Sequence, residues 1–399
     1  ESMIEIELKP GETLCKQGEV STDIYLLKDG KLEVFVRDHR GREKMVSEIS
    51  AKHSIFGEFG AILKKPRGAS VHAAQRSVVQ KIDTKNKGLD ETILGQPKLG
   101  LSISHNLARY LKDTNVRLSQ YTQLLNDIRA AAEGALRFYF QKTKFMGDLH
   151  DKNKAPWAKT IFDKAKLHPC YAMGETVSKG QEAIVGETAS AAQVLTSPEI
   201  PSDPANVKEF NAGEVIGKQG EEGRNFFILQ SGLLEIQVGG RKVSEVKEKG
   251  AIIGEVAVLV GIATKKFEAR SATIIAREPS AVTVIESSSL ESLIGAHPQL
   301  MLFITKVLSA RLAGTNQAFV VDDEKIAKYL ALMDASSPDS KTVINAFDLL
   351  RINIQSAAKD KPETDGFVEE IQTKSSDLKE DADSLQNRYD ELCRKWRTI

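Results

Sequence analysis

Residues 56–70 are the stretch whose residue types and spacing best suit a chemical task. Gly57 lets the backbone approach a ligand closely, and Glu58 offers two oxygens that accept hydrogen bonds from a sugar hydroxyl. Arg67 follows Glu58 by nine positions, and its planar set of donors suits a phosphate. Residues 59–63 can form one helical turn, whose first backbone amides favour an anion. Together these residues predict a site for a ribose that carries a phosphate.

This stretch resembles the phosphate-binding cassette of the cyclic nucleotide-binding domain family, which reads F-G-E-x-A-x-L and then P-R-x-A-[ST]. The sequence matches every position of the pattern except Gly60, where the family usually has alanine. The resemblance implies ligand contacts from Phe56, Gly57, Glu58, Phe59, Gly60, Arg67, Gly68, Ala69 and Ser70. The structural alternative is a hairpin in which Glu58 and Arg67 form a surface ion pair of little energetic value.

The elements around this stretch occur twice in the chain. Residues 4–82 alternate in short strands broken by Gly, Pro and Asp turns, which is typical of an antiparallel barrel or sandwich. Residues 11–19 (GETLCKQGE) return as residues 213–221 (GEVIGKQGE), at a constant offset of 202. With the family resemblance, this repeat predicts an α+β fold: two jelly-roll-like cyclic nucleotide-binding β-barrels, each with flanking helices. A long coiled-coil-like helix is expected after the first barrel, and a helical region at the C-terminus.

The second copy of the cassette departs from the first. Ile253 replaces the phenylalanine, and Arg270 follows Glu255 by fifteen positions instead of nine. The six extra residues could lengthen the loop harmlessly or pull Arg270 away from the phosphate. Ordering them costs about 1–2 kcal/mol of backbone entropy each, so the first site is expected to bind more tightly. The resemblance implies ligand contacts from Gly254, Glu255, Val256, Ala257, Arg270, Ser271, Ala272 and Thr273.

Both barrels are followed by helical segments with matching anchors. In bacterial relatives of the family, a threonine and its neighbour on the last helix cap the base. By resemblance, Thr114 and Asn115 are base contacts of the first site, and Thr315 and Asn316 are those of the second. Arg311, one turn earlier, is a further candidate, and Tyr110 occupies the same position in the first copy. The alternative is that these polar residues only cap or solvate a helix.

The first of these helices continues beyond the expected base contacts. An unbroken four-three spacing predicts a helix of more than thirty residues with one apolar seam. We expect this seam to form a homodimer, because the preceding barrel has no spare face long enough to cover it. The alternative is an amphipathic helix that packs on its own chain. The seam comprises Leu107, Leu111, Thr114, Leu118, Tyr121, Leu125, Ile128, Ala132, Ala135 and Tyr139.

The domain organisation follows from these patterns. We expect a first cyclic nucleotide-binding domain with its long helix over 1–143, a connector over 144–206, a second such domain over 207–321 and a helical region over 322–399. The connector is rich in Gly, Ala, Ser, Thr and Pro, with one expected helix at 157–166. Helices are expected at 323–333, 341–357 and 366–396. The last is a coiled-coil or bundle candidate with the seam Ile371, Ser375, Leu378, Ala382, Leu385, Tyr389, Leu392 and Trp396.

Composition and charge exclude several classes of protein. Lys plus Arg and Asp plus Glu both number 55, so no net field attracts nucleic acid or a membrane. The sequence shows neither a long apolar run nor a signal-peptide pattern. The three cysteines, Cys15, Cys170 and Cys393, are far apart and odd in number, which indicates no disulfide framework or metal site. A reducing, cytoplasmic location is expected.

Enzymes and transcription regulators are not favoured. The sequence has no Walker loop, no H-E-x-x-H, no nucleophile elbow and no kinase motif set, and its histidines are scattered singly. The segment 322–351 has no basic recognition helix, which argues against DNA binding. In a kinase regulatory subunit, a basic inhibitor stretch and docking helices are expected before the first barrel. This chain starts within about one residue of that barrel's first strand.

The remaining prediction is a cyclic nucleotide receptor that converts binding into a helix rearrangement. Cyclic AMP is the preferred ligand because the Thr-Asn pairs resemble adenine-capping residues, with cyclic GMP as the alternative. A protein partner is expected to read the helical regions, and no cofactor or metal is expected. The competing prediction is a scaffold that keeps the fold but has lost one or both ligand sites.

Overall fold

The computed structural model describes residues 4–37, 41–52, 54–82, 88–184, 206–334, 342–359 and 367–398. The chain divides into two compact units. The first unit comprises Glu1–Arg117 and Ala189–Ala318, and the second comprises Leu118–Thr188 and Phe319–Ile399.

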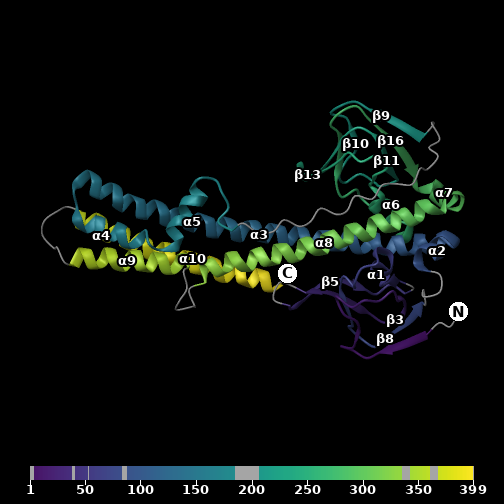
Figure 1. Cartoon of the computed structure of the whole chain (residues 1–399), viewed down its shortest axis with the longest axis horizontal. Helices are drawn as coiled ribbons and strands as arrows, with labels where there is room; N and C mark the ends of the chain where they lie inside the picture. Colours follow the sequence, from purple (N-terminus) through teal and green to yellow (C-terminus); the bar gives the residue numbers. More distant parts are fainter. Residues whose placement is uncertain are drawn as a thin grey trace. The chain divides into compact units, whose positions relative to one another are not determined.

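The N-terminal half of the first unit is a sandwich of two four-stranded sheets, in purple and blue in Figure 1. Antiparallel pairing gives one sheet the order β1-β8-β3-β6 and the other the order β2-β7-β4-β5. The strands are β1 Ile4–Leu8, β2 Thr13–Cys15, β3 Ile24–Asp29, β4 Leu32–Arg37, β5 Glu43–Ile49, β6 Ile55–Phe56, β7 Ser70–Ala73 and β8 Ser77–Ile82. Because side chains alternate along a strand, Leu27, Leu32 and Val79 all point inward and are completely buried.

The second half repeats this architecture. Its sheets have the orders β14-β11-β16-β9 and β10-β15-β12-β13. The strands are β9 Val207–Phe210, β10 Val215–Gly217, β11 Asn225–Ser231, β12 Leu234–Val238, β13 Arg241–Val246, β14 Ile252–Ile253, β15 Thr273–Ala276 and β16 Ser280–Glu286. The register shift between Leu27 and Asp29 of β3 recurs between Leu229 and Ser231 of β11. The duplication therefore includes the irregularities of the sheets, and the expected fold class is confirmed.

One repeated glycine shows why the turns are conserved between the halves. Gly30 and Gly232 have φ angles of 103° and 97°, in the left-handed region. A Cβ atom would lie 2.3 Å from the hydroxyl of Ser77 at Gly30, and 2.1 Å from that of Ser280 at Gly232. Both turns thus need a glycine for conformation and for space.

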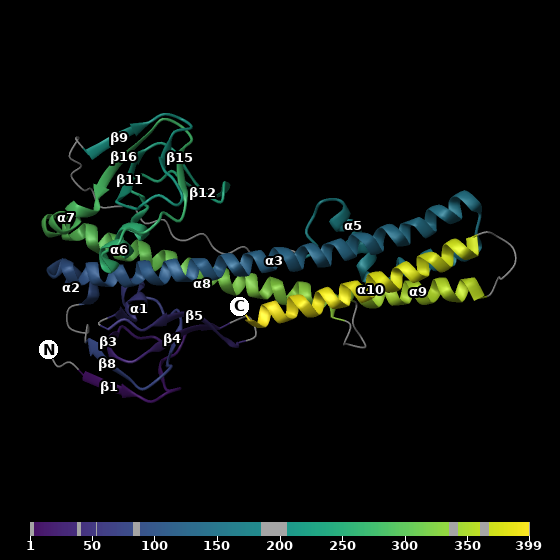
Figure 2. The ribbon, with the colours of Figure 1, turned by 180° about the vertical axis from the view of Figure 1, so that it is seen from behind.

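Helices of the first unit flank the two sandwiches. They are α1 Glu58–Leu63, α2 Gly88–Gly95, α6 Glu255–Thr264, α7 Leu290–Ala296 and the first parts of α3 Pro97–Asn153 and α8 Pro298–Met333. Helices α3 and α8 are in contact here, as Figure 2 shows, with 2.9 Å between the hydroxyls of Ser104 and Thr305. The close approach depends on Gly100, where a Cβ would lie 2.8 Å from Cγ of Met301. Since Ser104 and Thr305 are counterparts in the two halves, the chain pairs its own repeated helices.

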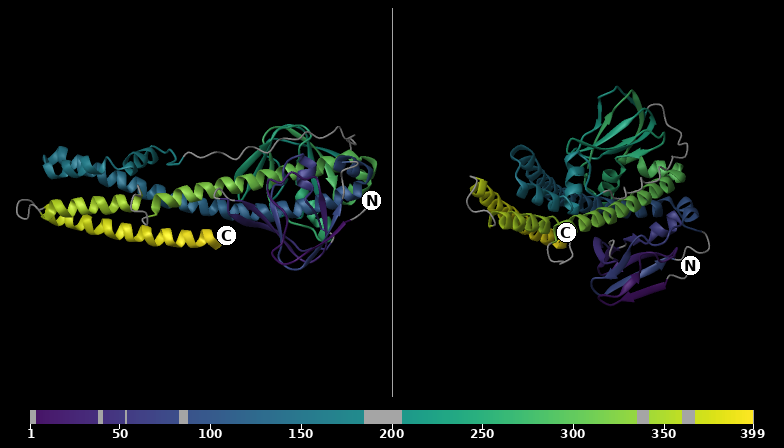
Figure 3. Two further views of the ribbon diagram at one scale, coloured as in Figure 1. Left: turned by 60° about the horizontal axis from the view of Figure 1, so that its bottom comes forward. Right: turned by 60° about the vertical axis from the view of Figure 1, so that its left-hand side comes forward.

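The second unit is a helical bundle. It contains the rest of α3 and α8 together with α4 Pro156–Ala165, α5 Pro169–Ser178, α9 Val343–Lys359 and α10 Phe367–Thr398. Helices α9 and α10 lie side by side (Figure 3), and α4 packs on α9. The indole nitrogen of Trp396 donates to the buried carboxylate of Asp323 at 2.9 Å, which ties α10 to α8.

The part of the α3 seam from Leu118 to Tyr139 is largely buried within this bundle. Tyr121, Ile128 and Ala132 are completely buried in the single chain. The ring of Tyr121 lies 4.3 Å from that of Phe319, and the hydroxyl of Tyr139 donates to the carbonyl of Ala165 at 2.9 Å. The homodimer was expected because the preceding barrel has no spare face to cover this seam, but other helices of the same chain cover it instead. The alternative of packing on the same chain applies.

Several expected boundaries differ from the observed elements. Helix α3 is 57 residues long and ends at Asn153, inside the expected connector. That connector also contains α4, one residue from its expected position, and α5, whereas residues 185–205 lie outside the described residues. The helix expected at 323–333 is the end of α8. Within the C-terminal seam, Leu378, Ala382, Leu385, Leu392 and Trp396 are buried, and the side chains of Ile371 and Ser375 lie outside the described residues.

Over the described ranges, no single helix is long and apolar enough to cross a membrane. One bent pair of helices, Ser287–Ala296 with Pro298–Met333, has the length and apolar composition of a membrane span only when the two helices are taken together.

Candidate functional site

The first cassette folds as a glycine turn followed by a short helix. Gly57 has a φ angle of 83° and caps the N-terminus of α1. A Cβ at this position would lie 2.9 Å from Nη1 of Arg67, so the glycine lets the arginine return against the turn. The helix ends at Leu63, and the left-handed conformation of the capping residue Lys64 redirects the chain towards Arg67.

Arg67 is buried and held from several sides. Its guanidinium donates to the carbonyl of Gly57, to the carbonyl of Asp23 at 2.6 Å and to the hydroxyl of Ser21 at 3.0 Å. It also lies over the ring of Tyr25, 5.7 Å from its centre. Its Nε atom is buried and has no partner among the described residues. Because Glu58 is buried as well, the surface ion pair of the structural alternative does not apply.

Glu58 is a buried acid with unused acceptor capacity. Its side chain is 2 % exposed, and Oε2 has no hydrogen-bond partner in the described part of the chain. Burial raises the pKa of this carboxyl to about 7, against the opposing influence of its own backbone amide and of Arg67. A hydroxyl donor placed beside Oε2 would satisfy this atom.

These residues line a cavity of about 90 Å³ inside the first sandwich. Its walls comprise Cys15, Val34, Val46, Ser47, Ile49, Phe56, Gly57, Glu58, Gly60, Arg67, Gly68, Ala69, Val71, Tyr110, Thr114, Leu312 and Asn316. The cavity therefore brings together most of the residues expected at the first site. Ser70 lies behind it, where its hydroxyl accepts from the amide of Gln17 at 3.1 Å, and the side chain of Phe59 lies outside the described residues.

The cavity is also lined by residues that were not expected at the first site. Val34 and Ser47, which are paired on β4 and β5, could have been found from the inward-facing positions of the alternating strands. Val46 could not, because it directly precedes Ser47 and lies at the register shift of β5. Tyr110 was noted only as the counterpart of Arg311. Leu312 comes from α8 of the other half, and no local sequence signal predicts its presence in this cavity.

The second cassette absorbs its six extra residues without displacing its arginine. Four of them lengthen α6 relative to α1, and two lie between the left-handed Lys265 and Arg270. A Cβ at Gly254 would lie 2.8 Å from Nη1 of Arg270. The corresponding distance from a Cβ at Gly57 to Nη1 of Arg67 is 2.9 Å. The sequence left open whether the insertion moves Arg270. In the structure the insertion leaves it against the cassette glycine.

Arg270 is held by a different set of partners from Arg67. It donates to the carbonyl of Asn225 at 2.9 Å and to the side-chain oxygen of the same residue at 2.6 Å. Asn225 thus supplies the contact that the hydroxyl of Ser21 supplies in the first half. The counterpart of Ser21 in the second half is Gly223, which has no side chain. Nη1 of Arg270 is buried and has no partner within the described ranges. Burial lowers the pKa of this guanidinium, and nearby Glu221 and Glu286 oppose the shift.

Glu255, the acid of the second cassette, is already paired. Its buried carboxylate accepts from Arg311 of α8, and the same guanidinium donates to the carbonyl of Ile252 at 2.5 Å. Oε2 of Glu255 has no partner among the described residues. Of the other expected contacts, Ala257 is buried, Val256 packs on the core, Ala272 is half-buried, and Ser271 is exposed. Thr273 accepts from the amide of Gln219 at 3.0 Å, as Ser70 does from Gln17.

The expected base contacts on α3 and α8 are distributed differently from the prediction. Thr114 lines the first cavity as expected, but Asn316, which was assigned to the second site, lines the first cavity too. Asn115 is exposed, and its side-chain oxygen accepts from the hydroxyl of Thr315 at 3.2 Å instead of lining the first cavity. The physical reason is the contact between α3 and α8, which places residues of each helix beside the other half.

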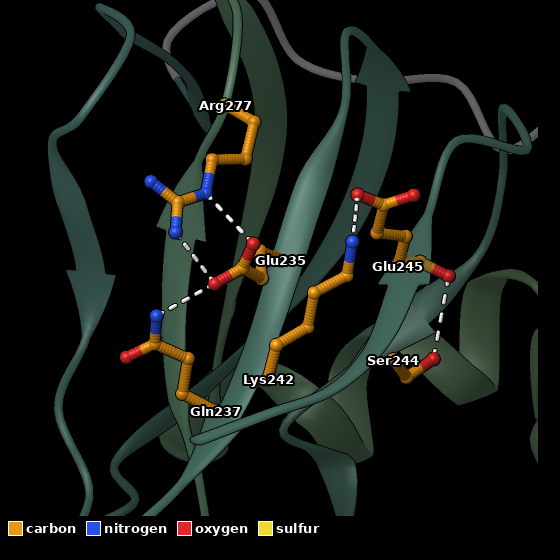
Figure 4. Close-up of polar contacts among 6 residues, drawn as sticks. All are labelled: Glu235, Gln237, Lys242, Ser244, Glu245 and Arg277. Carbon is orange, nitrogen blue, oxygen red and sulfur yellow. Dashed lines mark hydrogen bonds and ion pairs between the residues drawn. The ribbon is translucent and has the colours of Figure 1, made fainter. Parts of the chain in front are cut away.

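Another charged cluster of the second sandwich has a structural explanation. Figure 4 shows Glu235 of β12 accepting from Arg277 at 2.6 and 2.9 Å and from Gln237 at 2.6 Å. These hydrogen bonds, chiefly that from Arg277, lower the pKa of Glu235 to about 2. Lys242 and Glu245 pair on the neighbouring strand β13. The donors of this cluster are engaged with protein carboxylates, so they do not form an anion site.

Comparison with known proteins identifies the repeated domain. The family model of the cyclic nucleotide-binding domain matches residues 5–86 and 207–297. A cGMP-dependent protein kinase of Plasmodium berghei is 39 % identical over 67 residues, which cover 17 % of this chain and 7 % of the kinase. A cAMP-dependent protein kinase regulatory subunit of Blastocladiella emersonii is 34 % identical over 82 residues, which cover 21 % of this chain and 20 % of that subunit.

The matches with these curated relatives thus span no more than about a fifth of their length. Among solved structures, the regulatory domain of Toxoplasma gondii PKA, crystallised with cAMP, is 18 % identical. The alignment covers 77 % of this chain and 84 % of that one, with a TM-score of 0.20. The two matched segments coincide with the two sandwiches and their cassettes. The chain carries two cyclic nucleotide-binding domains in tandem.

Proposed function

We propose that the protein is a receptor for a cyclic nucleotide, with cyclic AMP preferred and cyclic GMP as the alternative. One observation carries the proposal: each cassette pairs a buried arginine, turned back onto a left-handed glycine, with a glutamate whose buried Oε2 has no partner in the part of the chain that the structure describes. The arginine supplies donors for a singly charged phosphate, and the glutamate accepts from a ribose hydroxyl. Unsatisfied buried polar groups are costly, so a ligand that satisfies both is stabilised.

In this proposal, the first site binds phosphate through Arg67 and the amides of the α1 turn, and ribose through Glu58. Thr114 and Asn316 contact the base. The second site uses Arg270 and Glu255 in the same roles, with Arg311 beside the ribose. The choice of cyclic AMP rests on the threonine and asparagine residues, which resemble adenine-capping residues. The names of the relatives include both cAMP- and cGMP-dependent kinases, so cyclic GMP is kept as the alternative ligand.

The output we propose is a movement of α3 and α8, read by a protein partner and without catalysis by this chain. The proposal is supported by the continuity of α3: Thr114 belongs to the same 57-residue helix that contributes Tyr121 and Tyr139 to the helical bundle. A ligand that prefers one position of the helix shifts the population towards that position. The homodimer is not retained in this proposal, because its seam is buried in the chain. We propose a cytoplasmic location, with which three cysteines that form no disulfide among the described residues agree.

A scaffold that has lost its ligand is the second candidate, and two observations favour it. The first cavity holds only about 90 Å³, and Glu255 is paired with Arg311. A thermal-shift titration separates the candidates. Cyclic AMP or cyclic GMP at about a hundred times its dissociation constant should stabilise the fold by roughly 2.7 kcal/mol.

The matched control is the double variant Arg67→Ala/Arg270→Ala, which should lose the shift. Linear 5′-AMP tests whether any adenine phosphate suffices. A wild-type protein that neither cyclic nucleotide stabilises would favour the scaffold.

A further inference from the structure

Tyr110 of α3 occupies the interior of the first sandwich. Its side chain is 6 % exposed and belongs to the same buried cluster as Cys15, Phe56 and Val71, which come from the surrounding strands. The guanidinium of Arg109 lies 5.3 Å from the centre of its ring. Leu312 of α8 packs against the same cluster. The tyrosine ring is therefore part of the barrel core.

The enclosed space beside Tyr110 is smaller than an ordinary site for a nucleotide. The cavity bounded by Tyr110, Glu58 and Arg67 has a volume of about 90 Å³. Ligand sites for molecules of this class measure on the order of 300 Å³ or more. Since protein interiors are close-packed, the missing volume has to come from side chains that leave the cavity.

The second half lacks this obstruction. Arg311 is the counterpart of Tyr110, and it is 36 % exposed at its side chain while it pairs with Glu255. An aromatic cap that stacks on a base has to lie on the outer side of that base. Tyr110 lies among the inward-facing side chains instead, where the ligand itself has to lie.

We propose that Tyr110 closes the first cavity and has to withdraw, together with its segment of α3, before a nucleotide can enter. This inference rests on the proposed function and adds regulation to the same site. Tyr110 is a positioning residue that lowers the affinity of the first site. Because Thr114 lies four residues further along the same helix, expulsion of the ring links occupancy of the first site to the position of α3.

The test measures the first site alone, in an Arg270→Ala background, by calorimetry with cyclic AMP and cyclic GMP. Tyr110→Ala should tighten binding by roughly tenfold or more, since ligand entry no longer has to expel a ring. Tyr110→Phe retains a ring of the same shape and should show no such gain. Weaker binding by Tyr110→Ala would overturn the inference and identify Tyr110 as a stacking cap.

Two further measurements keep the test decisive if Tyr110→Ala fails to fold. Leu312→Ala enlarges the same cavity from α8 and should also tighten binding, whereas unchanged or weaker binding contradicts closure.

In protein labelled with 3-fluorotyrosine, the ¹⁹F signal that Tyr110→Phe removes should shift to a solvent-exposed position at saturation. An unchanged signal with bound ligand overturns this inference alone. Absence of binding in the wild type and in every variant overturns the proposed function as well.

Discussion

Arg311 on α8 donates to the buried carboxylate of Glu255 on α6, so the helix after the second sandwich is held to its cassette by an ion pair. The side chain of Glu255 is 1 % exposed, whereas that of Arg311 is 36 % exposed. Removal of the arginine would leave a buried charge without its partner. That penalty is larger than the small contribution of an exposed pair.

Arg311→Ala should therefore destabilise the ligand-free protein by about 1–3 kcal/mol, less than for a fully buried pair because the arginine is partly solvated. Urea denaturation measures the change. The double variant Arg311→Ala/Glu255→Gln is the control, and it should recover much of the loss because no charge stays buried. Equal stability of the single variant and the wild type would show that Glu255 needs no charged partner.

Glu58 should make the stability of the ligand-free protein depend on pH. Its pKa is raised from 4.5 to about 7, so the folded state binds this proton more tightly than the unfolded state. The stability that the proton provides is complete below about pH 4.5 and is lost as the pH rises through 7. The loss has an upper bound of roughly 3 kcal/mol, from 2.5 pKa units at 1.36 kcal/mol each.

Glu58→Gln removes this titration. Relative to the wild type, the variant should become more stable as the pH rises from 5 to 8. Denaturant midpoints at both pH values test the expectation, and a difference that does not change with pH contradicts it.

Nucleotide binding at the first site should release a proton. A ribose hydroxyl that donates to Glu58 stabilises the carboxylate, which lowers its pKa from about 7. In the Arg270→Ala background at pH 6.5, the binding enthalpy should vary with the ionisation enthalpy of the buffer. The release should lie between zero and one proton. Glu58→Gln should remove the buffer dependence, and its persistence in that variant would assign the proton to another group.

The sequence predicted those parts of the site that depend on local chain geometry. Gly57, Glu58 and Arg67 lie within ten residues, and a glycine turn with a short helix is enough to bring them together. The duplicated fold was also readable, because matching turns recur at a constant offset. Contacts between the halves were not readable. Asn316 and Leu312 reach the first cavity only because α3 and α8 pack against each other, which no local pattern encodes.

The same limit explains the error about the seam. The four-three spacing correctly predicted a buried stripe on α3, because periodicity reports burial. It carries no information about which surface covers the stripe. Phe319, Phe347 and Ala165 do so from segments that lie more than twenty residues away in sequence.

The two arginines should rank the sites in the opposite order to that expected from the cassette sequences. Arg270 holds its place despite the insertion, and its Nη1 has no partner among the described residues, whereas Tyr110 narrows the first cavity. Arg270→Ala should therefore abolish the tighter binding event or weaken it roughly ten- to a hundredfold, the value of one charge-assisted bond.

Arg67→Ala is the matched variant and should leave the tighter event in place. Calorimetry on both variants and the wild type decides the ranking. A tight event that survives Arg270→Ala and disappears with Arg67→Ala would show that Tyr110 offers no resistance to the ligand.

The buried seam of α3 predicts how the protein behaves on dilution. Ile128 is completely buried within one chain, so Ile128→Glu places a charge in the bundle without a partner and should destabilise it by several kcal/mol. The unfolding midpoint of the wild type should be independent of protein concentration, because no second copy is needed to cover the seam. Exposed Asn126, on the other side of α3, gives the control Asn126→Glu, which should change stability by less than about 0.5 kcal/mol. Denaturation at concentrations a hundredfold apart, with sedimentation velocity, measures both effects. Two results together would show that the seam is an interface between two copies of the chain. The unfolding midpoint would rise with protein concentration, and Ile128→Glu would dissociate a dimer into folded monomers.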